Sequence, residues 1–416
     1  MSRKKVLIIS FNLPPFNNPQ SIQIGRLLYY LKKENEKLGN IIDIYIVTAD
    51  MINAKKDTSL YPDFWEGFHN VIKIQYRSYG IIDIIKSRFL IYKLPDIYIK
   101  WHKVAFKELV KKYPQRKFFD LIITFSYPAS TNLLGMWLKE YYQSKWIAYH
   151  SDPWSDNPYM RYRGLSLIYN KVLEKKSFIS ADKHIFVSDE MKQYYTLKYP
   201  DLENKFYVLY HSFDDNLFKY KRFNKLLNSR DYKVVRYIGS FYGIRTPEPF
   251  FKALLEIPEE IRSKLKIEII GGGLKLPIFI RKYKLDNYVR VINHVNYVDS
   301  LNYMSQADLL LLIDGALDDS NRAKFGQYIF FPSKLVDYIG SGTLILGITP
   351  KGTSFKILSE LGYPCFEPHE ISKISSWLID YLKGKYEYIP PINYKELIDR
   401  FNIAYNIKKF IDYILE

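Results

Sequence analysis

The segment from Tyr328 to Gly347 reads YIFFPSKLVDYIGSGTLILG. It predicts a Pro-Ser entry, a short helix, a Gly-Ser-Gly break and an apolar strand. Ser333 is expected to cap the helix, which puts Lys334 in the first turn, where unpaired backbone N–H groups point outward. A helix N-terminus beside a lysine favours a phosphate group, and Asp337 follows one turn later on the same face. An ordinary capped helix before a buried strand has the same spacing.

Outward from this segment, apolar runs alternate with helical patterns along the chain. Near the N-terminus, a continuous apolar strand at Lys5–Ser10 precedes the loop Phe11–Ser21, an amphipathic helix and a strand at Ile41–Ala49. This order predicts a doubly wound α/β domain that binds ligands at the carboxyl ends of its strands. Further strands are predicted at Phe119–Ser126, Lys145–Trp154, Val234–Phe241, Lys266–Gly273, Val289–Val295, Ala307–Asp314 and Thr343–Ile348.

The length of 416 residues exceeds one ordinary hydrophobic core and favours two domains. A polar, basic stretch at Asp215–Lys233 indicates the boundary between them. We therefore predict two α/β domains, residues 1–215 and 216–390, followed by an amphipathic helical segment at 391–416.

The net charge of +17 suggests a polyanionic partner: nucleic acid, an anionic membrane surface or a phosphorylated substrate. The abundance of Lys, Ile, Tyr and Asn is also typical of an AT-rich genome, which offers a second explanation for the basic excess. Cys365 is the only cysteine, so no intrachain disulfide is expected and a reducing compartment fits. The first apolar run ends before Asn12, which predicts a buried strand rather than a signal peptide.

No apolar run approaches the roughly 20 residues that span a bilayer. We therefore expect a cytoplasmic protein, with peripheral attachment to the inner face of the cell membrane as a candidate property. The stretch Gly80–Lys112 suits an in-plane membrane contact, because Ile81, Ile84, Ile85 and Phe89 share one helical face beside basic residues. An amphipathic helix packed on its own domain has the same pattern.

Glycines end several predicted strands of the second half: Gly239, Gly271–Gly273 and Gly315. Such glycines let a backbone approach a nucleotide closely, although a single one is usually only a tight turn. Arg245 follows the first of these strands and could clamp phosphates in bidentate fashion, or be a solvated loop arginine. Neither G-x-G-x-x-G nor a P-loop occurs.

In the first half, the strand end HSDPWSDNPY at His150–Tyr159 carries Asp152 and Trp154. The turn could place a carboxylate near a sugar hydroxyl and an aromatic face under a sugar ring; an Asx-type turn and a half-buried tryptophan are the alternatives. The seven histidines show no metal-binding spacing, and no G-x-S-x-G elbow is present.

Together these segments resemble GT-B glycosyltransferases, in particular glycosyltransferase family four. The segment FFPSKLVDYIGSGTLIL (330–346) resembles the Pro-x-Lys-Leu-x-Glu-Tyr-x-x-x-Gly signature of that family. The ordered set covers nearly the whole chain. It comprises FNLPPFNNPQSIQIGRLLYYL (11–31), LPDIYIKWHKVA (94–105), AYHSDPWSD (148–156), RYIGSFYGIRTPEPFFKAL (236–254), IEIIGGG (267–273), VNYVDSLNYMSQADLLLLI (295–313) and FFPSKLVDYIGSGTLIL (330–346).

The resemblance implies two Rossmann-like domains with a cleft between them, and a C-terminal helix crossing back to the first domain. It also implies transfer of a sugar from a nucleotide-diphosphate sugar to a glycan or lipid-linked acceptor. No metal or cofactor and no nucleic acid would be needed. The residues carried over are the donor-phosphate contacts Gly239, Arg245, Ser333 and Lys334, the Gly-rich strand end at Gly272, the ribose-binding Asp337, Asp152 near the reacting sugar, and the acceptor-side residues Asn12, Pro15 and Trp154.

Two positions depart from the pattern of family four. The first acid of its Glu-x7-Glu pair falls at Ile329, and the second is Asp337 rather than glutamate. At the His-Asp strand end, Ser151 precedes Asp152 and His150 lies one place off. The retaining stereochemistry and the surface-polysaccharide or glycolipid pathway therefore rest on the remaining motifs.

Two other functions are alternatives to glycosyl transfer. A nucleotide-sugar 2-epimerase would use the same fold but needs titratable groups around the sugar, and the sequence offers no clear set. A non-enzymatic nucleic-acid-binding protein would explain the charge, but the basic residues are dispersed and no recognised binding module occurs.

Overall fold

The computed structural model describes residues 3–51, 56–76, 95–160, 162–218, 231–315 and 326–416. It divides into two compact units. Unit 1 comprises Met1–Tyr210 and Asn406–Glu416, and unit 2 comprises His211–Tyr405. The boundaries between the units thus follow residues 210 and 405. The boundaries predicted from the sequence follow residues 215 and 390.

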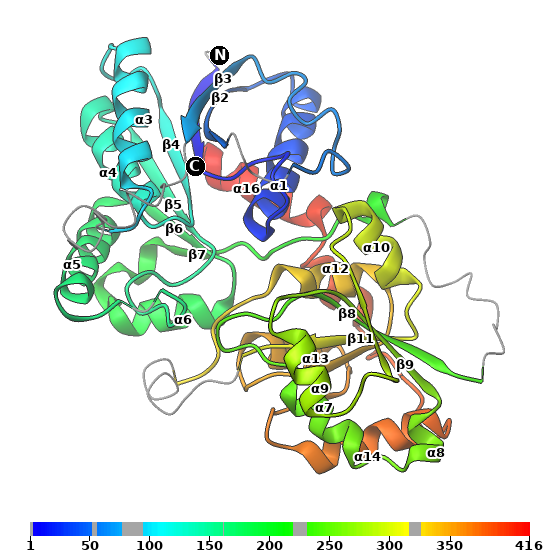
Figure 1. Cartoon of the computed structure of the whole chain (residues 1–416). Helices are drawn as coiled ribbons and strands as arrows, with labels where there is room; N and C mark the ends of the chain where they lie inside the picture. The colour runs from blue at the N-terminus through cyan, green and yellow to red at the C-terminus, as the bar shows by residue number, and fades with distance from the viewer. Residues whose placement is uncertain (1–2, 52–55, 77–94, 161, 219–230, 316–325) are drawn as a thin grey trace. The chain divides into compact units, whose positions relative to one another are not determined.

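The described part of unit 1 is built on a seven-stranded parallel sheet in the order β3-β2-β1-β4-β5-β6-β7. In Figure 1, α1 and α16 cover one face of this sheet, and α3 and α4 cover the other. The strands are β1 (Lys4–Ser10), β2 (Ile42–Met51), β3 (Asn70–Tyr76), β4 (Leu121–Ser126), β5 (Lys145–His150), β6 (Lys183–Phe186) and β7 (Phe206–Val208). The helices are α1 (Pro19–Lys37), α3 (Ile99–Lys112), α4 (Ser130–Tyr142), α5 (Gly164–Ser180), α6 (Asp189–Lys198) and α16 (Ile403–Leu415).

Strands β1 and β4 form the centre of this sheet, with Ile9 opposite Thr124. Both are continuous buried runs, as expected for a parallel sheet with helices on its two faces. Strand order reverses between them, so their carboxyl ends form the topological switch point, where α/β sheets bind ligands.

Unit 2 repeats this plan in its described residues, with a six-stranded parallel sheet in the order β10-β9-β8-β11-β12-β13. Its switch point lies between β8 and β11. The strands are β8 (Lys233–Ser240), β9 (Leu265–Gly272), β10 (Val289–Ile292), β11 (Leu309–Ile313), β12 (Ile345–Ile348) and β13 (Cys365–Phe366). The helices are α7 (Glu248–Leu255), α8 (Glu259–Arg262), α9 (Leu276–Lys282), α10 (Tyr297–Ser305), α12 (Ser333–Ser341), α13 (Thr353–Glu360), α14 (Ile371–Leu382) and α15 (Tyr394–Asp399).

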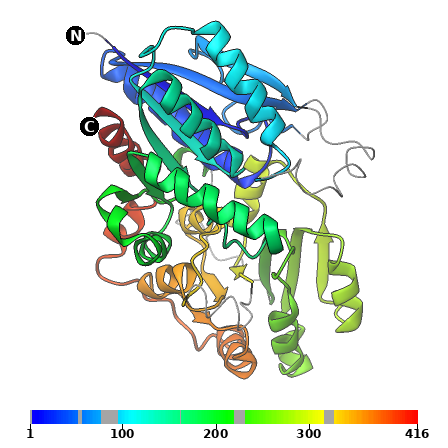
Figure 2. The same ribbon diagram turned by 90° about the vertical axis from the view of Figure 1, so that its left-hand side faces the viewer.

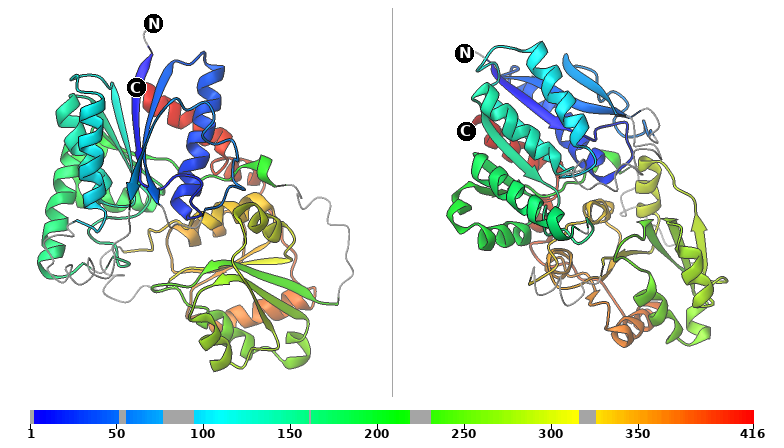
Figure 3. Two further views of the ribbon diagram at one scale, coloured as in Figure 1. Left: turned by 45° about the horizontal axis from the view of Figure 1, so that its top comes forward. Right: turned by 60° about the vertical axis from the view of Figure 1, so that its left-hand side comes forward.

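The C-terminal segment is two helices, α15 and α16, where the sequence pattern predicted one. α15 belongs to unit 2, where the hydroxyls of Tyr363 and Tyr394 lie 2.8 Å apart. α16 lies beside the sheet of unit 1, as both views of Figure 3 show, and the Tyr413 hydroxyl donates to the Val208 carbonyl at 3.3 Å.

The predicted fold class, two Rossmann-like domains with a C-terminal helix on the first, is confirmed. The strand predicted at Lys145–Trp154 ends at His150, because the chain turns at Ser151. The apolar face predicted from Ile81 to Phe89, and most of the predicted basic boundary, lie outside the described residues.

Candidate functional site

The N-terminus of α12 lies in unit 2, and its first residues differ from the predicted cap. Pro332, with extended backbone, occupies the N-cap position, and Ser333 is already the first helical residue. The prediction that Ser333 caps the helix is therefore wrong, because a residue with helical backbone cannot turn its side chain onto the following N–H groups. Lys334 lies in the first turn as predicted.

The side chain of Lys334 reaches over the end of β8. Its ammonium group is buried, makes no hydrogen bond with any residue that the structure describes, and lies 4.0 Å from the centre of the Tyr237 ring. Burial, reinforced by the nearby Arg245 cation, lowers the pKa of Lys334 to about 7, while the Asp314 carboxylate acts in the opposite direction. A buried amine without an acceptor indicates a place that a ligand oxygen could fill.

Arg245 and Asp314 complete the charges beside Lys334. An Arg245 nitrogen lies 3.4 Å from a carboxylate oxygen of Asp314; the Asp314 side chain is buried, and that of Arg245 is 9% exposed. The other Asp314 oxygen accepts a hydrogen bond from the Ser354 hydroxyl at 2.6 Å. The Arg245 and Lys334 cations therefore both lie near the Asp314 carboxylate at the ends of β8 and β11, and positive groups at this edge of the sheet suit an anion.

Asp314 was not among the residues predicted from the sequence. It directly follows β11, a strand of five buried apolar residues. A carboxylate at the carboxyl end of a continuous apolar strand was the signal that could have identified it, because that edge of a parallel sheet is where ligands bind.

Gly239 keeps this end of the sheet open. Its φ is +123°, and a Cβ added there would lie 3.0 Å from the Lys334 amine. The neighbouring strand ends at Gly271 and Gly272, where a Cβ would lie 3.1 Å from the Gly239 carbonyl and 2.3 Å from Leu276, respectively. The backbone can be this close only without side chains.

We expect Gly239→Ala to destabilise the protein by about 1–3 kcal/mol, since alanine is strained at this φ. The new methyl group should also displace the Lys334 amine and weaken anion binding. Thermal unfolding with and without ligand measures both effects. Gly384→Ala is the matched control, because its φ is +70° but a Cβ there meets nothing within 4 Å. Equal loss of ligand binding in the two variants would contradict this role of Gly239.

The remaining predicted donor-side residues lie on the same elements. Ser333 adjoins Lys334, and Asp337 follows one turn later on α12, where it is buried. The structure thus brings Lys334, Gly239 and Arg245 together. The contacts of Ser333, Asp337 and Gly272 with a donor stay predictions.

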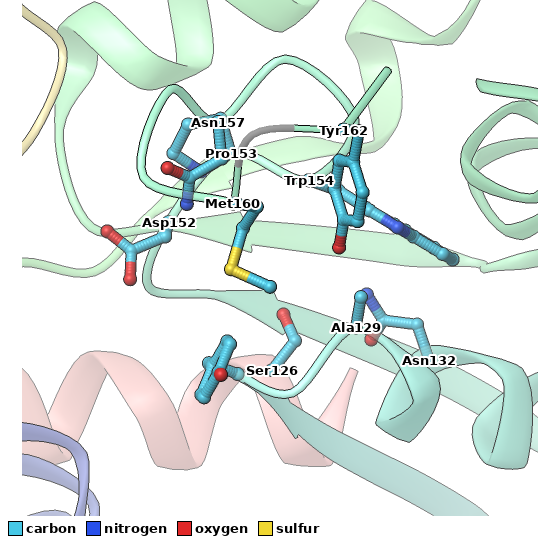
Figure 4. Close-up of a pocket in the computed structure, with 10 residues that line it drawn as sticks. Ser126, Ala129, Asn132, Asp152, Pro153, Trp154, Asn157, Met160 and Tyr162 are labelled. Atoms are coloured by element: carbon cyan, nitrogen blue, oxygen red, sulfur yellow. The ribbon is translucent and has the colours of Figure 1, made fainter. Parts of the chain in front are cut away.

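Unit 1 has a pocket of its own at the carboxyl ends of β4 and β5 (Figure 4). Figure 4 shows the Met160 side chain in the middle of the lining residues, with Asp152 at their edge. The lining is mainly apolar and aromatic, with a few amide and carboxylate groups. It consists of Ser126, Tyr127, Ala129, Asn132, Asp152, Pro153, Trp154, Asn157, Met160 and Tyr162.

Asp152 and Trp154 both line this pocket, but they differ in exposure. Asp152 is exposed, whereas Trp154 is only 4% exposed to solvent and packs with Ile99 and Leu133. The Trp154 indole nitrogen donates to Asn170 of α5 at 2.8 Å. Most of the indole thus belongs to the core, and contact of either residue with a sugar stays a prediction.

Asn12 and Pro15 lie in the loop after β1. The Asn12 amide donates to Gln20 at 3.0 Å, and Gln20 in turn donates to the Phe125 carbonyl at the end of β4. The loop is therefore tied to the switch point of the unit 1 sheet. Pro15 is partly exposed, and its carbonyl accepts the N–H of Asp57 at 2.6 Å.

His150, at the end of β5, is part of the core. It is buried, and its Nε2 lies 3.0 Å from Nδ1 of His184. Burial holds the pKa of His150 well below its usual range, and burial lowers that of His184 to about 3. Two neutral imidazoles joined by one hydrogen bond fit this environment, so His150 has a structural role.

Among the described residues, no group of three or more His, Cys, Asp or Glu side chains is placed to hold a metal ion. Within the same residues, no helix combines the length and apolar character needed to cross a membrane.

No protein-family model matches the sequence, and no curated protein matches it. Solved structures do match over nearly the whole chain. They include Anabaena HepE in complex with UDP and glucose (11% identity, TM-score 0.65, 99% of both chains) and sucrose-phosphate synthase from Thermosynechococcus elongatus (15% identity, TM-score 0.67, 99% of this chain and 98% of that chain). A third is a putative UDP-N-acetylglucosamine 2-epimerase from Listeria monocytogenes (13% identity, TM-score 0.58, 99% of this chain and 96% of that chain). The chain therefore has the GT-B fold.

Proposed function

We propose that this chain is a glycosyltransferase that moves a sugar from a nucleotide-diphosphate sugar to a glycan or lipid-linked acceptor. The observation that carries the proposal is the buried amine of Lys334, which has no hydrogen-bond acceptor among the described residues and lies beside Arg245 and Gly239 at a helix N-terminus. We place the donor diphosphate there.

The chemistry of the step explains why cations belong at this place. When the sugar leaves, negative charge develops on the nucleoside diphosphate, and preorganised positive groups lower the energy of that state. Lys334, Arg245 and the first N–H groups of α12 supply such groups without a metal ion. In a retaining front-face reaction the departing phosphate accepts the proton of the acceptor hydroxyl, so no strong protein base is required. We propose this retaining course for synthesis of a surface polysaccharide or glycolipid.

A thermal-shift screen with UDP-, GDP-, dTDP- and CMP-sugars in EDTA tests donor binding. UDP-glucose is the first compound to try, because UDP and UDP-glucose are bound in the HepE structures. A donor that binds only the folded state must raise the unfolding temperature. Stabilisation in EDTA by a UDP-, GDP- or dTDP-sugar that is lost in Arg245→Ala supports the proposal, whereas no stabilisation by any of these three diphosphate donors overturns it. The CMP-sugar carries a single phosphate and serves as the comparison.

Donor binding should weaken as the pH rises above about 7. In the ligand-free protein, the Lys334 amine loses its proton near that pH. A bound diphosphate favours the charged amine, so binding at higher pH must take up a proton, and affinity should fall by about tenfold per pH unit. Calorimetric titration in two buffers of different ionisation enthalpy measures the proton uptake. Lys334→Arg should abolish it, and a slope unchanged in that variant would contradict the assignment.

A nucleotide-sugar 2-epimerase is the second candidate, favoured by the structural match to a putative enzyme of that type. Incubating the protein with a nucleotide sugar and no acceptor separates the two functions, because only an epimerase makes a new nucleotide sugar. Formation of such a product at a rate above that of hydrolysis would favour the epimerase.

A further inference from the structure

Helix α5 of unit 1 exposes an apolar stripe. Leu165 is 82% exposed, Ile168 60% and Val172 47%, and Tyr169 and Ile179 are exposed as well. The spacing i, i+3, i+4 and i+7 places the first four side chains on one helical face. In Figure 2, α5 is the green helix across the middle of the view, and no described helix or strand of unit 1 lies in front of it.

The opposite face of α5 packs on the core of unit 1, so the exposed stripe is a second, separate face of the helix. Asn170, Glu174, Ser177 and Phe178 are buried on that side. Asn170 accepts the indole N–H of Trp154, and Glu174 pairs with Lys198 at 2.5 Å. The exposed apolar stripe therefore lies on a face of α5 that does not pack on the core of unit 1. Contiguous exposed apolar patches are uncommon on soluble proteins and often mark interaction sites.

The charges that α5 exposes have one sign. Lys171, Lys175 and Lys176 are exposed, and the only acidic residue of the helix, Glu174, is buried. Arg163, directly before the helix, is exposed too. A stripe of large apolar side chains beside exposed lysines of the same helix is complementary to a surface that is apolar inside and anionic outside.

We propose that α5 is a membrane-docking surface, on which the helix lies in the plane of an anionic lipid bilayer. The apolar stripe would enter the acyl boundary while the three lysines meet the headgroups. The helix has 17 residues and begins two residues after Tyr162, which lines the unit 1 pocket. Docking would therefore bring that pocket close to the lipid surface, where the lipid-linked acceptor of the proposed function would reside.

Vesicle sedimentation of the full chain tests the proposal without any donor or acceptor, so its result is independent of the proposed function. The vesicles are phosphatidylcholine alone, or phosphatidylcholine with about one third phosphatidylglycerol. We expect binding to the anionic vesicles, weakened when salt is raised from about 0.1 M to about 0.5 M. Absence of binding to the anionic vesicles at the lower salt overturns the proposal.

Two variants assign the binding to α5. Replacing Leu165, Ile168 and Val172 together by serine should weaken binding by about tenfold or more, because the inserted apolar area is lost. Replacing Lys171, Lys175 and Lys176 by glutamine should weaken binding to anionic vesicles by about a hundredfold and remove the salt dependence. Circular dichroism melts verify that both variants fold.

Matched controls carry the same number of substitutions elsewhere. The apolar control replaces Leu274, Ile278 and Ile392 by serine, and the charge control replaces Lys252, Lys264 and Lys383 by glutamine; all six residues are exposed in unit 2. Both should bind vesicles as the wild type does. If a control loses as much binding as the α5 variants, or if the α5 variants only convert a dimer to a monomer in sedimentation velocity, the assignment is overturned.

Discussion

Replacing Lys334 by methionine is expected to reduce donor-dependent turnover by about a hundredfold to a thousandfold, the usual cost of losing one group that stabilises transition-state charge. The folded protein should nevertheless be at least as stable as the wild type. The Lys334 amine is buried without a hydrogen-bond acceptor among the described residues, and methionine fills the same volume without a charge to desolvate. Steady-state kinetics and thermal unfolding of the ligand-free protein measure the two effects.

The combination of the two results distinguishes this role from a structural one. Replacing a lysine that merely supported the fold would lower stability and activity together. Replacing a buried lysine that binds the ligand lowers activity but not the stability of the ligand-free protein, because the unpaired amine destabilises that state. Lys373→Met is the matched control, since that side chain is 69% exposed on α14 and should change neither quantity. Turnover within twofold of wild type in Lys334→Met would refute the assignment of the phosphate site.

The phosphate end of this site was predictable because its signals are local. A lysine in the first turn of a helix, and glycines at strand ends, follow from short stretches of sequence. The resemblance to family four implied that Gly239, Arg245 and Lys334 contact the same donor phosphates, and parallel strands do bring their carboxyl ends to one edge of a sheet. The Lys334 amine lies 3.0 Å from the place that a Cβ on Gly239 would take, which agrees with this expectation.

Features that depend on distant packing were not predictable in the same way. The partner of the Trp154 indole is Asn170, on a helix whose place is set by the whole unit 1 core. The prediction that Ser333 caps α12 was wrong by one residue, since Pro332 is the N-cap. The exact start of a helix depends on backbone angles, which sequence patterns define poorly. Strand β13 has only two residues, too few for any periodicity.

The pocket of unit 1 depends on a charge cluster that likewise became visible only in three dimensions. Lys198 of α6 lies 2.6 Å from an oxygen of Asp156 and 2.5 Å from an oxygen of Glu174. Both carboxylates are buried. Glu174 also accepts the backbone N–H of Ser155 at 2.7 Å, and the Tyr194 hydroxyl donates to Asp156. The cluster therefore holds the loop that lines the pocket.

Replacing Lys198 by methionine is expected to destabilise the protein by about 3–5 kcal/mol, because it removes a cation that is paired with two buried carboxylates. Thermal and urea unfolding measure the loss. Lys282→Met is the matched control. Its ion pair with Glu248 is also short, 2.7 Å, but the lysine side chain is 56% exposed, so its removal should leave the stability nearly unchanged.

The source of the Lys198 effect can be separated from lost packing. If uncompensated charge is the cause, adding Glu174→Gln and Asp156→Asn to Lys198→Met should restore most of the stability, since neutral amides need no cation. Failure of this triple variant to recover stability would mean that the lysine stem, rather than its charge, holds the loop. Because Ser155 is bound by Glu174, the single variant should also loosen the pocket and raise the KM for the acceptor more than that for the donor.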